Sequence, residues 1–74
     1  MARQPIGMTR GRLLLLAVLR VTTTYAVAVR CRCYQQRIVD WANGRDRPNA
    51  ESRAKLEREY GIPAAAWSIP YRPR

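Results

Sequence analysis

The stretch from Tyr34 to Asn49, YQQRIVDWANGRDRPN, decides the fold of this chain. Ile38, Trp41 and Ala42 recur at i, i+3 and i+4, so they form one apolar stripe along a helix. Gly44 ends that helix, because glycine takes the left-handed conformation beyond a helix C-terminus without steric cost. A helix of about two turns is not stable alone. The sequence therefore predicts a short helix here that neighbouring helices hold in place.

The opposite face of this helix carries side chains that can read DNA. Gln35, Gln36 and Arg37 lie there, and Asp40 follows one turn later. Glutamine can form a bidentate pair with adenine, and arginine with guanine, in the major groove. The same side chains also suit an ordinary solvated helix face, so the rest of the chain must decide between the two interpretations.

The charge of the chain favours a polyanionic partner. The 74 residues form one small domain, with 14 Lys and Arg against 5 Asp and Glu and a net charge of +9. Residues 1–37 contain seven arginines and no acidic residue. Such an uneven positive field attracts either nucleic acid or an anionic membrane.

The sequence offers little for catalysis or metal binding. Histidine is absent, and Cys31 and Cys33 are the only thiols. Two sulfurs at i, i+2 cannot complete a four-ligand zinc site, and a bridge between them would be strained. We interpret both cysteines as small buried or half-buried apolar residues, with a redox or intermolecular role as the alternative. No nucleophile with its base, carboxylate pair or phosphate-binding glycine loop occurs, so we expect neither an enzyme nor a cofactor, metal or small-molecule substrate.

The amino-terminal region is predicted to hold a loose basic arm over residues 1–11 and then a first helix. The run Leu13 to Leu19 is the most apolar in the chain, and its expected inner face is Leu13, Leu16 and Ala17. Because this run is apolar on all sides, residues left uncovered by the domain could form a homodimer contact. The expected contact residues are Leu14, Leu15 and Val18.

A membrane or export segment is the rival interpretation of this region. Residues 13–29 carry only one charge, Arg20, and Ala26 to Ala28 offers a cleavage-like pattern. A charge at the centre of a span costs about 2.5 to 3.5 kcal/mol, and seventeen residues barely cross the hydrocarbon core. Thr22 to Thr24 dilute the segment further. We therefore expect a cytoplasmic protein for which membrane association is unlikely.

Further helices are expected on both sides of the glutamine-bearing helix. Thr22 to Thr24 would cap a second helix, Thr24 to Arg30, with Val27 and Ala28 facing inward. The turn Cys31 to Cys33 then gives a helix-turn-helix layout. Asn49 would cap a fourth helix that ends at Gly61. The expected inner face of that helix is Ala50, Ala54, Leu56 and Tyr60, followed by a short turn Pro63–Trp67 that covers the core and a tail over residues 68–74.

The segment from Thr23 to Ile62 resembles the Cro/repressor-type (XRE-like) helix-turn-helix domain of phage and bacterial regulators. Ala28 matches the small residue that packs on the following helix, and Asn43-Gly44-Arg45 with Pro48 resembles the N-G-[KR]-x-x-P loop of the family. The pattern A-x-x-x-A-x-L-E-x-x-x-G-I-P after this loop resembles its fourth helix and exit. The resemblance implies an all-α, compact four- to five-helix bundle over residues 12–67.

Two positions depart from the family pattern. Arg32 stands where the turn usually has glycine, and Tyr34 stands where a Ser or Thr cap usually precedes the recognition helix. Arg32 can occupy this position only in a backbone conformation that is unfavourable for a residue with a side chain, or in a turn of different geometry.

The resemblance also implies a function and a set of contacts. It implies a small transcriptional regulator, a repressor or Cro-like factor, that inserts helix 34–43 into the major groove of double-stranded DNA. Alternatives are a protein-interaction module on the same fold, such as an antitoxin or a phage inhibitor of a host complex, and a small basic membrane-associated or exported peptide. The implied base contacts are Gln35, Gln36, Arg37 and Asp40, and the implied phosphate contacts are Thr24, Asn43, Arg45 and Arg47.

Overall fold

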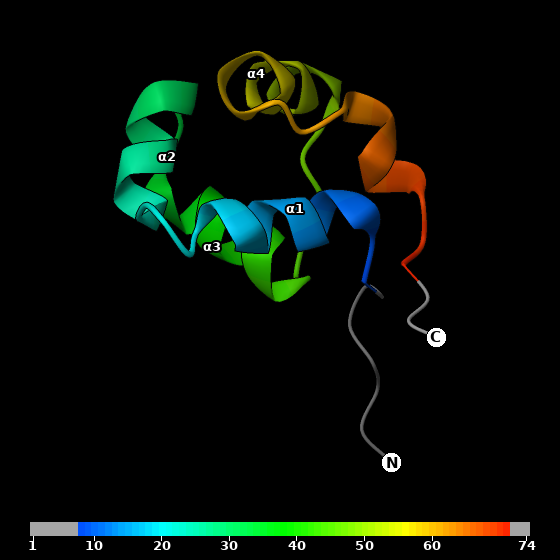
Figure 1. Cartoon of the computed structure of the whole chain (residues 1–74). Coiled ribbons are helices and arrows are strands. Elements are labelled where there is room, and N and C mark those ends of the chain that lie inside the picture. Colours follow the sequence, from blue (N-terminus) through cyan, green and yellow to red (C-terminus); the bar gives the residue numbers. More distant parts are fainter. Residues whose placement is uncertain (1–7, 72–74) are drawn as a thin grey trace.

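The computed structural model describes residues 8–71, and this part of the chain is helical (Figure 1). It contains α1 (Arg10–Val18), α2 (Thr24–Cys31), α3 (Gln35–Asn43), α4 (Ala50–Tyr60) and a 3-10 helix η1 (Ala64–Ser68). Residues 8–71 hold no β-strand, only an isolated antiparallel bridge between Thr9 and Pro70. The all-α prediction is confirmed, whereas most of the predicted basic arm and the last three residues lie outside the described range.

The helix ends follow from their capping residues. The side chains of Thr9, Thr23 and Asn49 each accept a hydrogen bond, at 2.9 to 3.1 Å, from the backbone amide three residues further on. At the other ends, Gly44 and Gly61 adopt left-handed φ values of 77° and 72°. The predicted caps of α2 and α4, and the predicted glycine stops of α3 and α4, are confirmed.

One apolar core lies between the helices. The inward stripe of α3 and the inward face of α2 are buried as predicted, and Trp67 covers the core from η1 with 1% of its surface exposed. Cys31 is also buried, which agrees with its interpretation as a small apolar residue. The core residues are Leu15, Val27, Ala28, Cys31, Ile38, Trp41, Ala42, Leu56, Ile62 and Trp67.

The predicted inner face of α1 is wrong for Leu13 and Ala17 and correct only for Leu16, which packs partly on the core. Leu15 is fully buried, whereas Leu13 and Ala17 are exposed and Leu16 is only half-buried. A helix that is apolar on all sides gives no periodic signal for its rotation. Its rotation follows instead from Gly11, one turn before Leu15 on the same face, because Gly11 packs directly against Trp67.

Three further expectations about this region also change. Leu15 cannot belong to a dimer contact, and Val18 is half-buried against the core. Because Thr9 caps α1 and Gly11 is buried within it, the helix starts inside the segment expected to be a loose arm. The chain between Leu13 and Val29 is also not one helix, since α1 ends at Val18. In the described part of the chain, no helix combines the length and the hydropathy needed to cross a bilayer.

The predicted inner face of α4 is half correct. Leu56 is buried and Tyr60 packs partly on the core, but Ala50 and Ala54 are exposed. The first turns of α4 dock through Arg53 instead, whose guanidinium donates to the backbone carbonyl of Pro48 at 2.8 Å and to the hydroxyl of Ser68 at 3.2 Å. This polar contact leaves no apolar pattern in the sequence. The sequence therefore pointed to Ala50 and Ala54, which do not face the core.

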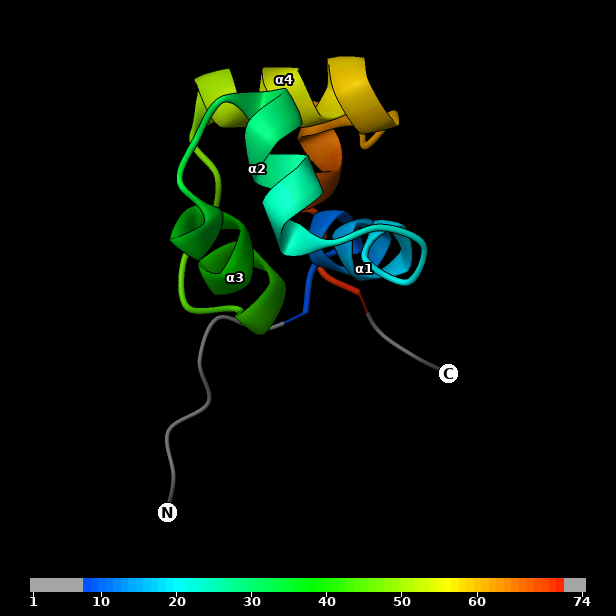
Figure 2. The same cartoon turned by 90° about the vertical axis from the view of Figure 1, so that its left-hand side faces the viewer.

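The two ends of the described chain are paired. The amide of Arg10 donates to the carbonyl of Ile69, and the amide of Tyr71 donates to the carbonyl of Met8, both at 2.9 Å. Figures 1 and 2 both show the first turn of α1 beside the segment that follows η1. The segment from Ser68 to Tyr71 is therefore an ordered part of the domain, although it was expected to be a tail.

Candidate functional site

A tight turn joins α2 to α3 and sets the direction of α3. Arg32 adopts a left-handed conformation, with φ 55° and ψ 50°, and is the only non-glycine residue of the described chain with a positive φ. The amide of Cys33 donates to the carbonyl of Ala28 at 3.0 Å and closes the end of α2. Tyr34 precedes α3 without a side-chain cap. The turn thus keeps the backbone shape that suits glycine, with arginine in its place.

Replacing Arg32 with glycine is expected to raise the free energy of unfolding by about 0.5 to 1 kcal/mol. Left-handed backbone costs an L-residue about 1 to 2 kcal/mol, and the greater freedom of glycine in the unfolded chain offsets part of this gain. Urea unfolding followed by circular dichroism measures the difference. The matched control is Arg30→Gly in the last turn of α2, which we expect to destabilise the domain by about 1 kcal/mol. A loss of stability in Arg32→Gly would mean that the Arg32 side chain contributes more than its backbone costs.

The outer face of α3 is exposed and joined to the start of α2. Gln35, Gln36 and Arg37 are all exposed, as the sequence predicts. The side-chain amide of Gln35 donates to the hydroxyl oxygen of Thr24 at 2.7 Å. Two of the predicted site residues, from different helices, are therefore in direct contact, and this bond fixes the first residue of α3 against the first turn of α2.

Asp40 organises the middle of this face. Its carboxylate accepts a hydrogen bond from the side-chain amide of Gln36 at 3.0 Å and lies 4.0 Å from the guanidinium of Arg45. The backbone amide of Arg45 also donates to the carbonyl of Asp40 at 2.9 Å. Asp40 therefore joins Gln36 of α3 to Arg45 of the loop after it.

The loop after α3 is buried where it meets α4 and exposed where it leaves α3. Pro48 is fully buried, and Arg53 holds its carbonyl as described above. Asn43, Arg45 and Arg47 are exposed. The amide of Arg47 donates to the carboxylate of Asp46 at 2.8 Å, which orders the backbone between the two arginines. The loop therefore presents two guanidinium groups beside the end of α3.

Arg12 is a supporting residue that the sequence analysis missed. Its Nε donates to the carbonyl of Ala42 at 2.8 Å, across thirty positions of sequence. The bond satisfies one of the last carbonyls of α3, and the positive charge suits the negative end of the helix dipole. No local pattern could have revealed it, because α1 and α3 meet only in the folded chain.

Two exposed tyrosines border the same face. Tyr25 lies next to Thr24 in the first turn of α2, and Tyr34 precedes Gln35, with 66% and 81% of their surfaces exposed. Tyrosine hydroxyls donate hydrogen bonds to phosphate oxygens in protein–DNA interfaces. Neither tyrosine was predicted to belong to the site, although each is the sequence neighbour of a predicted site residue, Thr24 or Gln35.

Cys31 and Cys33 lie at the turn between α2 and α3, and both thiols have low reactivity. Burial is the main cause that raises the pKa of Cys31 above its ordinary value, and the neighbouring Cys33 and Glu59 raise it further. Burial also raises the pKa of the half-buried Cys33. Both thiols therefore stay protonated at neutral pH and are poor nucleophiles. Within residues 8–71, no three His, Cys, Asp or Glu side chains gather where they could hold a metal ion.

The structure thus brings most of the predicted site residues onto one exposed face, formed by the first turn of α2, the outer side of α3 and the loop after it. Amide and guanidinium donors dominate this face, and Asp40 is the only carboxylate of α3. Such a face can donate hydrogen bonds to base edges and to anionic oxygens. Comparison with known protein families, curated proteins and solved structures finds no match for this chain.

Proposed function

We propose that this protein binds double-stranded DNA in a sequence-specific manner, as a small transcriptional regulator of the Cro/repressor (XRE-like) helix-turn-helix type. The 2.7 Å hydrogen bond between Gln35 and Thr24 carries the proposal. It ties the start of a candidate recognition helix to the start of the helix before it, while Gln36 and Arg37 stay uncovered. The left-handed turn at Arg32 and the net charge of +9 support the same assignment.

In this proposal α3 enters the major groove with its amino-terminal half. Gln36 and Arg37 contact base edges, and Gln35 keeps its amide oxygen free to accept from an adenine amine while its nitrogen is held by Thr24. The Thr24 hydroxyl accepts from Gln35, so its own proton remains available to a phosphate oxygen. Asp40 holds Gln36 and can accept from a cytosine amine.

The loop after α3 supplies the remaining phosphate contacts. Asn43, Arg45 and Arg47 lie beside the end of α3, where a backbone strand flanking the groove would pass. Such contacts fix the register of the protein on the duplex but carry no sequence information. Arg12 and Arg53 act indirectly, because they hold the end of α3 and the loop in place.

The experiment that tests the proposal is selection from a randomised duplex library, followed by titration of the enriched sites at two salt concentrations. Sequence-specific binding gives a recurrent motif. A failure to enrich any motif, with only steeply salt-dependent binding, would show that the positive charge attracts any polyanion. Half-sites about one helical turn apart would indicate two copies on one site.

The predicted homodimer is tested in the same experiment. Of its three predicted contact residues, Leu14 is exposed, Val18 is half-buried and Leu15 is fully buried. Leu13 is exposed beside Leu14, so any second copy on α1 would have to meet these two leucines. A motif without repeated half-sites would mean that one copy binds alone.

Replacing Gln36 with alanine is expected to weaken binding to the enriched site by about 1 to 3 kcal/mol and to leave binding to random DNA nearly unchanged. The reason is that a base-reading side chain contributes only where its base is present. Fluorescence anisotropy titrations on the two duplexes measure both values. Equal weakening on both duplexes would remove Gln36 from the base contacts.

Arg45→Ala is the matched variant for the phosphate role. It is expected to weaken binding to all duplexes alike and to lower the slope of log K against log salt concentration by about one unit. The pair separates the two kinds of contact, since Gln36→Ala leaves this slope unchanged. An unchanged slope in Arg45→Ala would exclude Arg45 from the phosphate contacts.

A further inference from the structure

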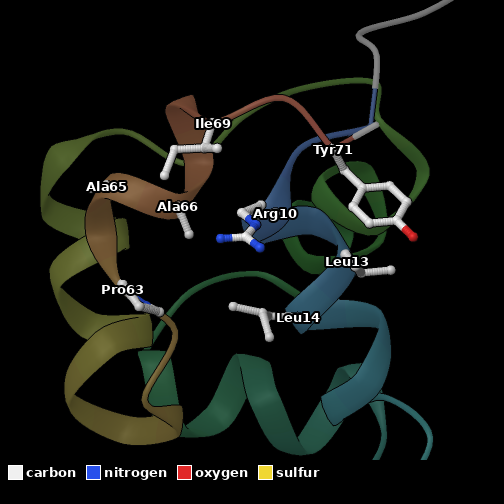
Figure 3. A pocket seen from close by; sticks show the side chains of 8 residues that line it. All are labelled: Arg10, Leu13, Leu14, Pro63, Ala65, Ala66, Ile69 and Tyr71. Carbon is white, nitrogen blue, oxygen red and sulfur yellow. The ribbon is translucent and has the colours of Figure 1, made fainter. Parts of the chain in front are cut away.

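The outer side of α1 carries an apolar surface that the DNA-binding proposal does not use. Leu13 and Leu14 are exposed there by 38% and 39%, and Ile69 and Tyr71 are exposed by 42% and 38% on the neighbouring segment. Between them lies a groove of about 350 Å³. Figure 3 shows its lining residues: Arg10, Leu13, Leu14, Pro63, Ala65, Ala66, Ile69 and Tyr71.

Among residues 8–71, Arg10 is the only charged residue that lines this groove. Figure 3 shows its guanidinium pointing into the space between α1 and the segment around η1. The ion pairs within residues 8–71 involve only Asp40 and Glu59 as acids, so no carboxylate of this range pairs with Arg10. A guanidinium beside apolar side chains offers two parallel donors to a planar carboxylate.

A second hollow continues the surface on the other side of the exposed leucines. It is lined by Leu13, Leu14, Leu16, Ala17 and Arg20. Leu13 and Leu14 thus form a ridge between two hollows, with Arg10 in one and Arg20 in the other. Arg10 begins α1 and Arg20 lies two residues beyond its end at Val18, so the two positive charges flank the exposed leucines from opposite ends of the helix.

We propose that this surface of α1 and η1 binds an amphipathic helix of another protein, one whose apolar stripe carries an acidic residue at each end. Apolar side chains at i, i+3 or i+4, and i+7 would lie against Leu13 and Leu14 in the two hollows. Carboxylates near the two ends of the partner helix would pair with Arg10 and Arg20.

Charge decides between such a helix and a second copy of this chain. Two copies paired through the same face would bring Arg10 and Arg20 against their own equivalents, with no carboxylate between them. In residues 8–71, the acidic side chains lie on α3, on the loop after it and on α4. The exposed apolar side chains of α4 are only Ala50 and Ala54, too small to fill the hollows. An acidic helix from another protein therefore complements the surface better than any described helix of the chain itself.

The surface shares no residue with the proposed DNA contacts. Its residues come from α1, η1 and the chain on either side of η1, whereas the DNA contacts come from α2, α3 and the loop after α3. The partner helix can therefore bind while DNA is bound, and this inference does not depend on the proposed function.

The test is selection from a displayed library of helical peptides on the full chain, with leucines fixed along one stripe and the flanking positions randomised. The expected result is enrichment of Glu or Asp at both ends of the leucine stripe. The best peptide is expected to bind Arg10→Glu about tenfold more weakly or worse, and a peptide with lysine in place of the matching acid should recover the loss on that variant. This recovery also shows that Arg10→Glu is folded. Arg58→Glu, an equal charge change at an exposed position on α4, should bind like the unaltered chain.

Three results would overturn the proposal. The first is a failure of charge recognition. The selected peptides would then lack acidic residues, or the best peptide would bind the unaltered chain and Arg10→Glu equally. The second is a sedimentation equilibrium experiment in which the chain alone forms a dimer that Leu14→Lys disrupts, because a second copy would then be the occupant. The third is binding to vesicles of phosphatidylglycerol and phosphatidylcholine that Leu14→Lys abolishes, with no peptide enriched, because a lipid surface would then be the occupant.

Discussion

Gly11→Ala is expected to lower the free energy of unfolding by about 2 to 3 kcal/mol, even though alanine favours helices. A Cβ atom at Gly11 would lie 2.6 Å from Cγ and 2.8 Å from Cε2 of Trp67, and closer still to Cδ2. These atoms belong to the rigid body of an indole that is 1% exposed, so neither side can move without opening the core. The measurement is urea unfolding followed by circular dichroism.

Trp67 owes its position to packing rather than to a hydrogen bond. No side-chain or backbone group of residues 8–71 accepts from its buried Nε1. A smaller residue should therefore relieve the clash, and Gly11→Ala combined with Trp67→Leu is expected to cost less than the sum of the two single changes. Gly61→Ala is the control, because a Cβ there meets nothing within 4 Å and only the left-handed backbone opposes it. Additive effects of Gly11→Ala and Trp67→Leu would show that the two residues do not constrain each other.

Trp41→Ala is expected to lower the free energy of unfolding by about 3 to 5 kcal/mol. Trp41 is among the largest fully buried side chains, and it joins α3 to the core on the side away from Gln36. A single core in a domain of this size rarely supplies more than about 3 to 5 kcal/mol, so the variant should be largely unfolded at 37 °C. Loss of the cooperative thermal transition in circular dichroism is the expected observation.

The control for Trp41→Ala is another aromatic residue beside α3. Tyr34 is 81% exposed, and Tyr34→Ala is expected to change stability by no more than about 0.5 kcal/mol. A similar loss of stability in both variants would contradict the assignment of α3 to the core through Trp41. If Trp41→Ala instead kept full stability, the inward stripe of α3 would not hold the helix in place.

The elements with a periodic pattern and a polar cap could be predicted from sequence. Ile38 and Trp41 gave the inward side of α3, and Gly44 gave its end, because both signals are local. Thr23 and Asn49 marked helix starts for the same reason. The exposed face with Gln35 and Gln36 followed directly, since the inward stripe leaves only one side free.

The predictions that were wrong or missing concern features that depend on contacts between distant segments of the chain. The rotation of α1 is set by Gly11 against Trp67, and no pattern within an apolar run could show which leucine faces inward. The anchoring of α4 through Arg53 and the bond from Arg12 to the end of α3 are likewise polar contacts across the fold. Asp40 could be placed on the right face, but its partners Gln36 and Arg45 could be identified only from the folded loop.

The pairing of the two chain ends has a consequence for synthesis. The backbone amides of Arg10 and Tyr71 donate hydrogen bonds to the carbonyls of Ile69 and Met8. The atoms nearest to a Cβ at Gly11 all belong to Trp67. The covering of the buried side of α1 is therefore complete only when the segment from Trp67 to Tyr71 has been added. While the ribosome is still adding α4, the nascent chain must expose Leu15 and its apolar neighbours. We therefore expect the growing polypeptide to keep apolar surface exposed, and to be prone to aggregation, until Tyr71 has left the ribosome.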